Sequence, residues 1–444
     1  KIVAESNYLS HSSTAIRFLI VCFLAVAGLI VGPAADGGAV EPSSQDGEEH
    51  YNAAEAMLAS GDTEEALQLF TAIADNFPRA RYPLFSWRAA AKVRAGQIEI
   101  DLGRVDAGVA RFVEVIDGET PSVWTTRARL GLATTLLWNR EWQAAARLLQ
   151  TIVDVSARAG PESDIIAYRD AEDRLTLLHR LWLRAEAGER PWQQAGRYSV
   201  DFAFDRPIGI AAGINGVLVT DEGNDLAIFF DSFDTAASFR VADPQRPWWG
   251  TSANGFVAAG SMVSAPLRTK SFQFVYPEGS RERPLDDIRA GVGMPDGGWY
   301  LVDSEYRGVM RFGRNGTFDH ILDTGVNSEP VDLDRGPRGR LFVIEKRSRE
   351  VLIFDAGGVL SAGFSYHDWR EPYALAVDSL GYVYVLDRGL KRIDVFDQDG
   401  GFLWTLGPVL PGGIELGDPR DLTVDSTGRI LIADRGLRTV VVVE

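Results

Sequence analysis

The chain has 444 residues, of which 45% are apolar, 24% charged and 10% aromatic, a composition typical of folded globular domains. Its 62 acidic and 45 basic side chains give a formal net charge of −17, which argues against a general nucleic-acid binder because most of the surface would repel phosphate. The single cysteine, Cys22, excludes an internal disulfide, a cysteine-built zinc site, an iron–sulfur cluster and a CxxCH haem attachment.

An uncharged apolar segment follows Arg17 and extends from residue 18 to residue 35. Its length lies between that of a signal-peptide core and the ~20 apolar residues of a transmembrane helix. Lys1 and Arg17 precede the segment, whereas the next basic residue after it is Arg79. Because positive charge marks the cytoplasmic side, this asymmetry predicts a cytoplasmic N-terminus and places the bulk of the chain on the periplasmic side of the cytoplasmic membrane.

We expect this segment to be retained, because the 16 residues before Arg17 are long for the n-region of a signal peptide. The predicted order is a cytoplasmic segment over 1–16, a single-pass signal anchor over 17–35 and a flexible linker over 36–50, rich in Gly, Pro, Ser and acids. Cleavage near the small residues at 32–39 is the alternative, and it would release a soluble periplasmic protein.

From Tyr51 the apolar residues recur with a helical period in alanine-rich segments. The first copy has a turn at Gly61-Asp62 between two such segments and resembles a tetratricopeptide (TPR) repeat, whose antiparallel helices need small residues where they cross. Two degenerate copies follow, with small and large residues in corresponding places: Gly96, Phe112, Gly131 and Leu149. We therefore expect a TPR-like α-solenoid over 51–190. The resemblance implies that it holds another protein; the alternative is that it only supports the next domain.

From Arg197 onward the hydrophobic period is two, and a unit recurs that is clearest over 371–407. It opens on a proline and an inner strand, and an acidic residue stands at the corner between its second and third strands. The corner acids Asp303, Glu345, Asp387 and Asp434 are 42, 42 and 47 residues apart, the length of a four-stranded blade. The pattern resembles an NHL-repeat β-propeller, and six units over 197–444 predict six blades. The fold class is therefore multidomain, α plus all-β.

The last unit contains only three strands before Glu444. An open propeller would leave an unpaired edge, so another segment should complete this blade. The alternating residues Tyr198–Phe204, just before the first unit, are predicted to supply the missing outer strand.

NHL-like propellers include a few enzymes, and we searched for their catalytic groups. A metal lyase of this kind needs several inward histidines, whereas the propeller has only His320 and His367, both expected on inter-blade loops. Calcium-dependent lactonase-like propellers use acids around the channel; Asp332, Asp334 and Asp421 are candidates, but most inner-strand residues are Ala, Leu, Ile or Val. The sequence also lacks G-x-S-x-G, P-loop and HExxH motifs. We predict no enzyme activity, no cofactor and no metal site.

Two surface features suggest protein contacts. Six basic residues occur within 15 positions of one unit, and four of them are predicted to flank a hairpin and to meet an acidic partner or lipid phosphates: Arg338, Arg340, Arg347 and Arg349. A solvated rim is the alternative. Trp248 and Trp249 are adjacent, so in a strand one of them should point away from the core and serve as an interface anchor.

Together these features predict a non-catalytic, membrane-anchored scaffold on the extracytoplasmic side. We expect an accessory or assembly subunit of a larger membrane complex, whether energy-transducing, secretory or envelope-building. Its predicted partners are proteins of that complex and, through residues 17–35, the membrane, with no nucleic acid and no small-molecule substrate. A soluble periplasmic ligand-binding or sensing protein is the alternative, and a propeller hydrolase or lyase is third.

Overall fold

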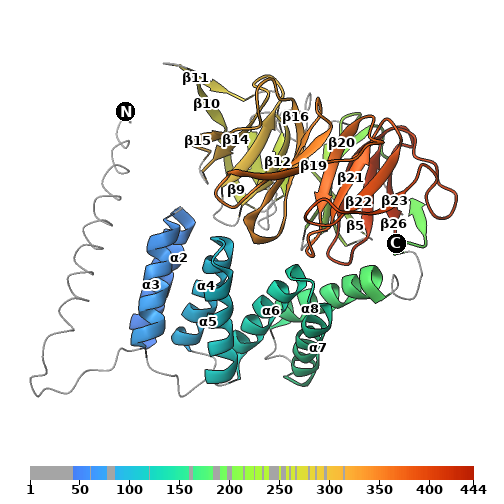
Figure 1. The fold of residues 1–444 in the computed structure, drawn as a ribbon. Helices are drawn as coiled ribbons and strands as arrows, with labels where there is room; N and C mark the ends of the chain where they lie inside the picture. The colour runs from blue at the N-terminus through green and yellow to red at the C-terminus, as the bar shows by residue number, and fades with distance from the viewer. Residues whose placement is uncertain are drawn as a thin grey trace, which may run out of the picture. The chain divides into compact units, whose positions relative to one another are not determined.

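The computed structural model describes residues 44–60, 62–77, 86–119, 121–159, 164–183, 191–197, 203–213, 216–224, 226–232, 235–239, 250–251, 257–259, 262–265, 268–278, 281–285, 288–294, 298–313 and 316–444. Ser44–Glu444 form one compact unit, in which helices come first and sheets follow (Figure 1). The predicted anchor over 17–35 lies outside the described residues. Of the helices within them, none has both the length and the apolar character needed to cross a membrane.

The helical part consists of consecutive antiparallel helices, which confirms the predicted helical repeats. They are α2 (Ser44–Ser60), α3 (Thr63–Asn76), α4 (Trp87–Asp101), α5 (Val105–Gly118), α6 (Val123–Trp138), α7 (Trp142–Ala159) and α8 (Ile165–Leu178), which continues into the π-helical turn η3 (His179–Leu183). Each helix packs on the next. Helix α2 begins at Ser44, so the end of the segment predicted as a flexible linker is helical.

Glycines allow these helices to approach closely around Phe112, whose side chain is fully buried. A Cβ atom on Gly108 of α5 would lie 2.6 Å from the carbonyl oxygen of Gly96 of α4. A Cβ atom on Gly131 of α6 would lie 2.5 Å from the ring of Phe112. Because real Cβ contacts are longer than this, any side chain at these positions would push the helices apart.

The sheets form a β-propeller with five blades of four antiparallel strands. These blades are β2 (Pro207–Gly213), β3 (Gly216–Asp221), β4 (Leu226–Ser232) and β5 (Thr235–Phe239); β12 (Ile288–Gly293), β13 (Trp299–Asp303), β14 (Gly308–Phe312) and β15 (Phe318–Leu322); β16 (Pro330–Arg335), β17 (Leu341–Glu345), β18 (Glu350–Phe354) and β19 (Leu360–Ser365); β20 (Pro372–Val377), β21 (Val383–Asp387), β22 (Arg392–Phe396) and β23 (Phe402–Leu406); and β24 (Pro419–Val424), β25 (Ile430–Asp434) and β26 (Thr439–Val443) with β1 (Ala195–Arg197).

The inner strands β12, β16, β20, β24 and β2 lie side by side in that order. Shorter strands lie between the β2–β5 and β12–β15 blades in the sequence: β6 (Gly250–Thr251) and a three-stranded sheet of β7 (Val257–Ala259), β8 (Met262–Ala265) and β9 (Arg268–Gln273). Strand β6 pairs in parallel with β12 and also lies beside β2. A separate hairpin joins β10 (Val275–Glu278) to β11 (Arg281–Pro284).

The last blade is completed by an earlier segment than predicted. Strand β1, not Tyr198–Phe204, pairs with β26, with Ala195 opposite Val443. Backbone hydrogen bonds between Gln194 and Glu444 continue this pairing. Just before the strand, the Trp192 indole N–H donates to the Gly428 carbonyl at 2.9 Å, and its ring packs edge-on against Tyr384. Phe204 instead packs in the core of the β2–β5 blade.

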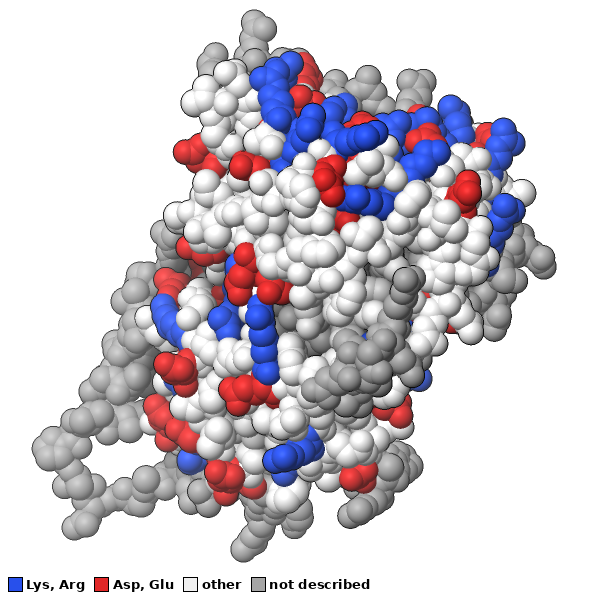
Figure 2. Space-filling view, turned by 45° about the vertical axis from the view of Figure 1, so that its right-hand side comes forward, with Lys and Arg blue, Asp and Glu red and all other residues white. Residues whose placement is uncertain are grey.

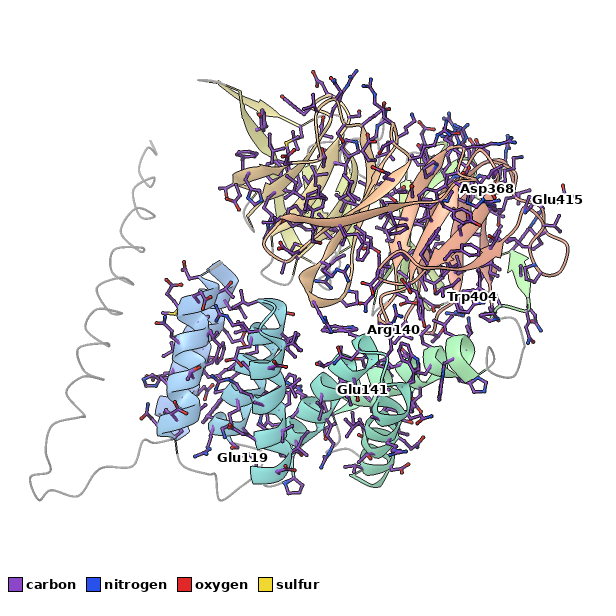
Figure 3. All side chains as sticks on the ribbon, in the orientation of Figure 1. Glu119, Arg140, Glu141, Asp368, Trp404 and Glu415 are labelled. Atoms are coloured by element: carbon purple, nitrogen blue, oxygen red, sulfur yellow. The ribbon has the colours of Figure 1, made fainter. Side chains whose placement is uncertain are left out.

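The helical part is joined to one end of the propeller by polar and apolar contacts. The Trp138 indole donates to the Ser379 carbonyl at 3.2 Å, and Arg140 pairs with Asp397 at 2.9 Å. Figure 3 shows Arg140 at this junction. One buried cluster combines helical and propeller side chains, among them Leu137 of α6, Leu177 of α8, Tyr384 of β21 and Ile430 of β25. The helical repeats and the propeller therefore share a core.

Candidate functional site

The two ends of each blade have different surroundings. At one end of each blade, turns join the first strand to the second and the third strand to the fourth. Residues 378–381 and 397–400 of these turns contact α6 and its C-terminal turn, so we call this end the helix face. We call the opposite end the corner face. It carries the turns between the second and third strands and the segments that lead into each blade. Because antiparallel strands place alternate turns at opposite ends, the two faces are separated by the length of a strand.

Buried acids fix the turns of the corner face. Asp387 accepts hydrogen bonds from the backbone N–H groups of Arg370 at 2.6 Å, Glu371 at 3.2 Å and Leu390 at 2.9 Å. The Leu390 bond lies within its own turn, and the other two reach the segment that leads into the blade. Asp434, Glu345 and Asp221 likewise bind both their own turn and the segment leading into the blade. These carboxylates therefore hold the loops rather than face a substrate.

A basic residue stands four positions after the corner acid in four of these turns: Arg307, Arg349, Lys391 and Arg438, which we call the turn bases. Each has a positive φ, between 50° and 58°. All four are exposed. Sequence reasoning missed this set, although the spacing of its members repeats that of the corner acids and could have revealed it.

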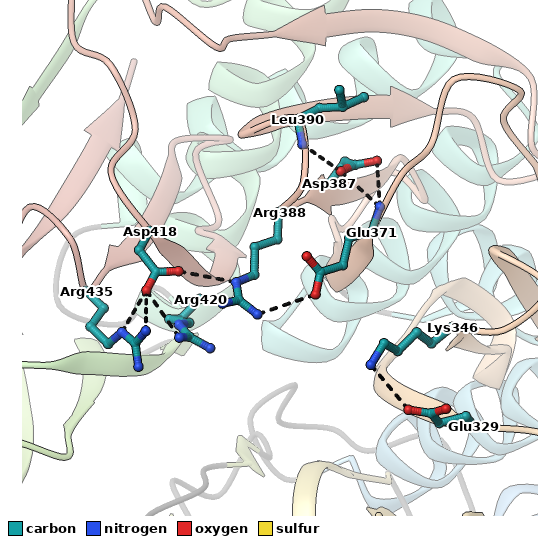
Figure 4. A network of polar contacts seen from close by, with 9 residues as sticks. All are labelled: Glu329, Lys346, Glu371, Asp387, Arg388, Leu390, Asp418, Arg420 and Arg435. Atoms are coloured by element: carbon teal, nitrogen blue, oxygen red, sulfur yellow. Dashed lines mark hydrogen bonds and ion pairs between the residues drawn. The ribbon is translucent and has the colours of Figure 1, made fainter.

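Half-buried ion pairs lie next to the turn bases on the corner face (Figure 4). Asp418 binds Arg435 at 2.6 Å, Arg388 at 3.2 Å and Arg420 at 3.2 Å, and Arg388 also reaches Glu371 at 3.4 Å. Burial alone would raise the pKa of Asp418, but the Arg435 hydrogen bond and the neighbouring guanidinium charges outweigh it and lower that pKa. Asp418 therefore stays ionised and compensates the charge of these arginines.

Basic side chains are concentrated at the corner face. Figure 2 shows Lys and Arg gathered over the upper part of the molecule, with carboxylates among them. Figure 3 places Asp368, from a segment that leads into a blade, at the same upper end. The local excess of positive charge contrasts with the net charge of −17 of the whole chain.

The structure separates the four arginines that were predicted to act together. Arg338 and Arg340 lie on the helix face: Arg338 donates to the Asn139 side chain, and Arg340 donates to the Gln398 carbonyl at 3.1 Å. Arg347 and Arg349 follow β17 and lie on the corner face. The expectation that a hairpin brings these two pairs together is wrong, because the whole of β17 lies between them. Trp248 and Trp249 lie outside the described residues.

The candidate channel carboxylates bind the backbone of neighbouring blades. Asp332 of β16 accepts from the Leu375 N–H of β20 at 2.6 Å, and Asp421 of β24 accepts from the Ile210 N–H of β2 at 2.9 Å. The second oxygen of each accepts from the next residue of its own strand. Asp334 is engaged in the same way, with the Val377 N–H at 2.8 Å. Burial raises the pKa of Asp332 to about 8 and that of Asp334 to about 6. These groups therefore join blades rather than present a ligand set.

Neither histidine of the propeller faces a metal site among the described residues. His320 lies on the outer strand β15, not on a loop as predicted, and contacts Asp319. His367 lies on a segment between blades, as predicted, and contacts Asp368. Within the described ranges, no group of three or more His, Cys, Asp and Glu side chains is arranged to hold a metal ion.

No family model matches the chain. No curated protein matches it. Similar solved structures include a streptogramin B lyase (12% identity, TM-score 0.43, covering 56% of this chain and 97% of that one). Another is a Kuenenia stuttgartiensis hydrazine synthase (13% identity, TM-score 0.40, covering 54% of this chain and 96% of that one). A third is the Neurospora crassa Pan2 WD40 domain (12% identity, TM-score 0.41, covering 56% of this chain and 94% of that one). These are distant propeller-fold neighbours, and similarity at this level indicates no shared activity.

Proposed function

We propose that this chain is a non-catalytic, membrane-anchored scaffold, an accessory or assembly subunit of a larger membrane complex on the extracytoplasmic side. The observation that carries the proposal is the shared core between the helical repeats and one end of the propeller. The helical repeats and a charged propeller face are thereby held in one body. Such a body can place two partners at a fixed geometry.

The use of the acids in the propeller supports a non-catalytic role. Asp332, Asp334 and Asp421, which were the best catalytic candidates, each accept two backbone hydrogen bonds. A general base or a calcium ligand needs an oxygen that is available to substrate or ion. Here the carboxylate oxygens bind backbone N–H groups on the inner strand of the next blade, where no strand-to-strand hydrogen bonds join the two blades among the described residues.

We further propose that the propeller has six blades of the NHL type and that the helices are TPR-like. Strand β6 lies between β12 and β2, the place in the ring where the described residues form no four-stranded blade. It would be the inner strand of the sixth blade, and β7–β9 would be its outer strands. The glycine crossings around Phe112 are of the kind that TPR helices require.

Membrane anchoring through residues 17–35 is proposed from the charge asymmetry of the flanks, with the folded unit on the periplasmic side. The test is purification of the tagged chain from native membranes after a carbonate wash, with intact-mass measurement. We expect the chain to remain in the membrane with its apolar segment and to co-purify with other subunits in constant proportion. A mature N-terminus near Asp36 or Val40, or a chain that purifies alone, would contradict the proposal.

A further inference from the structure

The turn bases occupy a backbone conformation that disfavours them. A residue with a Cβ atom is crowded at φ values between 50° and 58°, and glycine or asparagine is the usual choice there. The corner acids hold the turns in this conformation: the Asp387 carboxylate, for example, binds the Leu390 N–H immediately before Lys391. The same disfavoured choice recurs in four blades, and each time the residue is basic. Turn geometry alone does not account for this choice, whereas a role for the charge does.

The charges of the turn bases are also available. Among the described residues, no carboxylate forms an ion pair with Arg307, Arg349 or Lys391. Arg438 is 71% exposed, and its contact to Asp205 is 3.5 Å long. The bases beside them differ, because Arg388 and Arg435 already share Asp418, and Lys346 binds Glu329 at 3.3 Å. The corner face therefore has an inner layer of compensated charge and an outer ring of exposed bases, of which Arg307, Arg349 and Lys391 have no carboxylate partner among the described residues.

We propose that this ring is the docking surface for an acidic segment of a partner protein. A carboxylate can accept two parallel hydrogen bonds from the planar guanidinium group of an arginine, and the carboxylates of a peptide can be spaced to meet one base per blade. A lipid headgroup layer fits less well, because a continuous layer of phosphates would meet the half-buried carboxylates of Glu329, Glu371 and Asp418 as well as the bases, whereas the carboxylates of a peptide can be spaced to avoid them. The inference rests on the proposed scaffold role only in that the partner would be a subunit of the same complex.

The test uses glycine to remove charge without disturbing the turns. In the full chain, Arg307→Gly, Arg349→Gly and Lys391→Gly are combined. Glycine adopts positive φ freely, and among the described residues the change removes one side-chain hydrogen bond, from Arg349 to the Trp369 carbonyl at 3.2 Å. This triple variant should therefore stay folded, with a melting temperature close to that of the wild type. The matched control combines Arg129→Gln, Arg147→Gln and Arg169→Gln, which removes the same charge from the helices α6, α7 and α8. The probe is a fluorescent poly-glutamate peptide at low salt, followed by anisotropy.

We expect the wild type and the control to bind the peptide alike and the glycine variant to bind about tenfold more weakly, because close charge pairs and long-range attraction are both lost. Added salt should reduce the difference. Equal binding by the glycine variant and the wild type would overturn the proposal. The proposal would also be overturned if the glycine variant bound anionic phosphatidylglycerol vesicles more weakly than the wild type but bound the peptide equally well. Peptide binding does not depend on co-purification from membranes, so failure of the docking surface and failure of the scaffold role are distinguishable.

Discussion

Gly131 lies directly against the ring of Phe112, so that a Cβ atom on the glycine would come within 2.5 Å of the ring carbons. We expect Gly131→Ala to destabilise the protein by about 1–3 kcal/mol, because a methyl group there overpacks a core in which Phe112 has no room to move. Urea unfolding monitored by circular dichroism would measure this loss. Gly196→Ala is the matched control, since nothing lies within 4 Å of a Cβ atom at Gly196 and its φ is not positive; an equal loss in both variants would contradict the packing argument.

Closure of the propeller depends on Trp192, which is 1% exposed. Trp192→Ala should cost about 3–5 kcal/mol, because it leaves a large cavity and removes the hydrogen bond to the Gly428 carbonyl. Gln194→Ala should change stability by no more than about 0.5 kcal/mol, since its side chain is exposed and its backbone bonds with Glu444 are retained. Thermal unfolding of the two variants gives the comparison, and similar melting temperatures would show that Trp192 does not hold the closing strand.

The pH dependence of stability should report Asp332. Burial raises its pKa from 3.8 to about 8, so between these values the folded state holds a proton that the unfolded state releases. Its stabilising contribution is complete below about pH 4 and is lost as the pH rises through 8. Relative to Asp332→Asn, the free energy of unfolding of the wild type should therefore fall by up to about 1.4 kcal/mol per pH unit over this window.

The measurement is urea unfolding of both proteins from pH 5 to pH 8. Asp334, whose pKa burial raises to about 6, is present in both proteins. Its charge also contributes to the raised pKa of Asp332, so the difference between the two proteins reports the proton of Asp332 together with this interaction. Parallel pH profiles would show that Asp332 does not carry this proton.

The parts of the fold that sequence predicted are those determined by local chemistry. The spacing of Asp303, Glu345, Asp387 and Asp434 predicted blades correctly, because each corner acid binds backbone groups of its own turn. The last three also bind the segment leading into their blade. The small residues at Gly96 and Gly131 also predicted close helix crossings from local chemistry, because a residue without a Cβ atom lets the neighbouring helix approach at that position.

The remaining features depend on contacts between distant segments. Strand β1 has the sequence Ala-Gly-Arg, without the alternation that marked Tyr198–Phe204, and its pairing follows from contacts of Trp192 with residues more than 190 positions away. The association of the helices with one end of the propeller likewise has no sequence pattern. It was this association that removed Arg338 and Arg340 from the predicted surface cluster.

The separation of that cluster leads to a paired prediction. Arg338→Ser with Arg340→Ser should lower stability by about 1–2 kcal/mol, because hydrogen bonds to Asn139 and to the Gln398 carbonyl join the helices to the propeller. Arg347→Ser with Arg349→Ser should lower stability less, by up to about 1 kcal/mol, because the hydrogen bonds that these exposed side chains donate to the Asn327 and Trp369 carbonyls stay within the propeller.

Association with the native complex should show the opposite order. The Arg347 and Arg349 variant should bind more weakly at low salt, since it loses charge from the docking surface, whereas the Arg338 and Arg340 variant should bind as the wild type does wherever it remains folded. Thermal melts and co-purification of both variants from native membranes make the comparison. If the two variants weaken association equally without a difference in stability, the helix face carries partner contacts too, and the division of the cluster between an internal junction and an external surface is wrong.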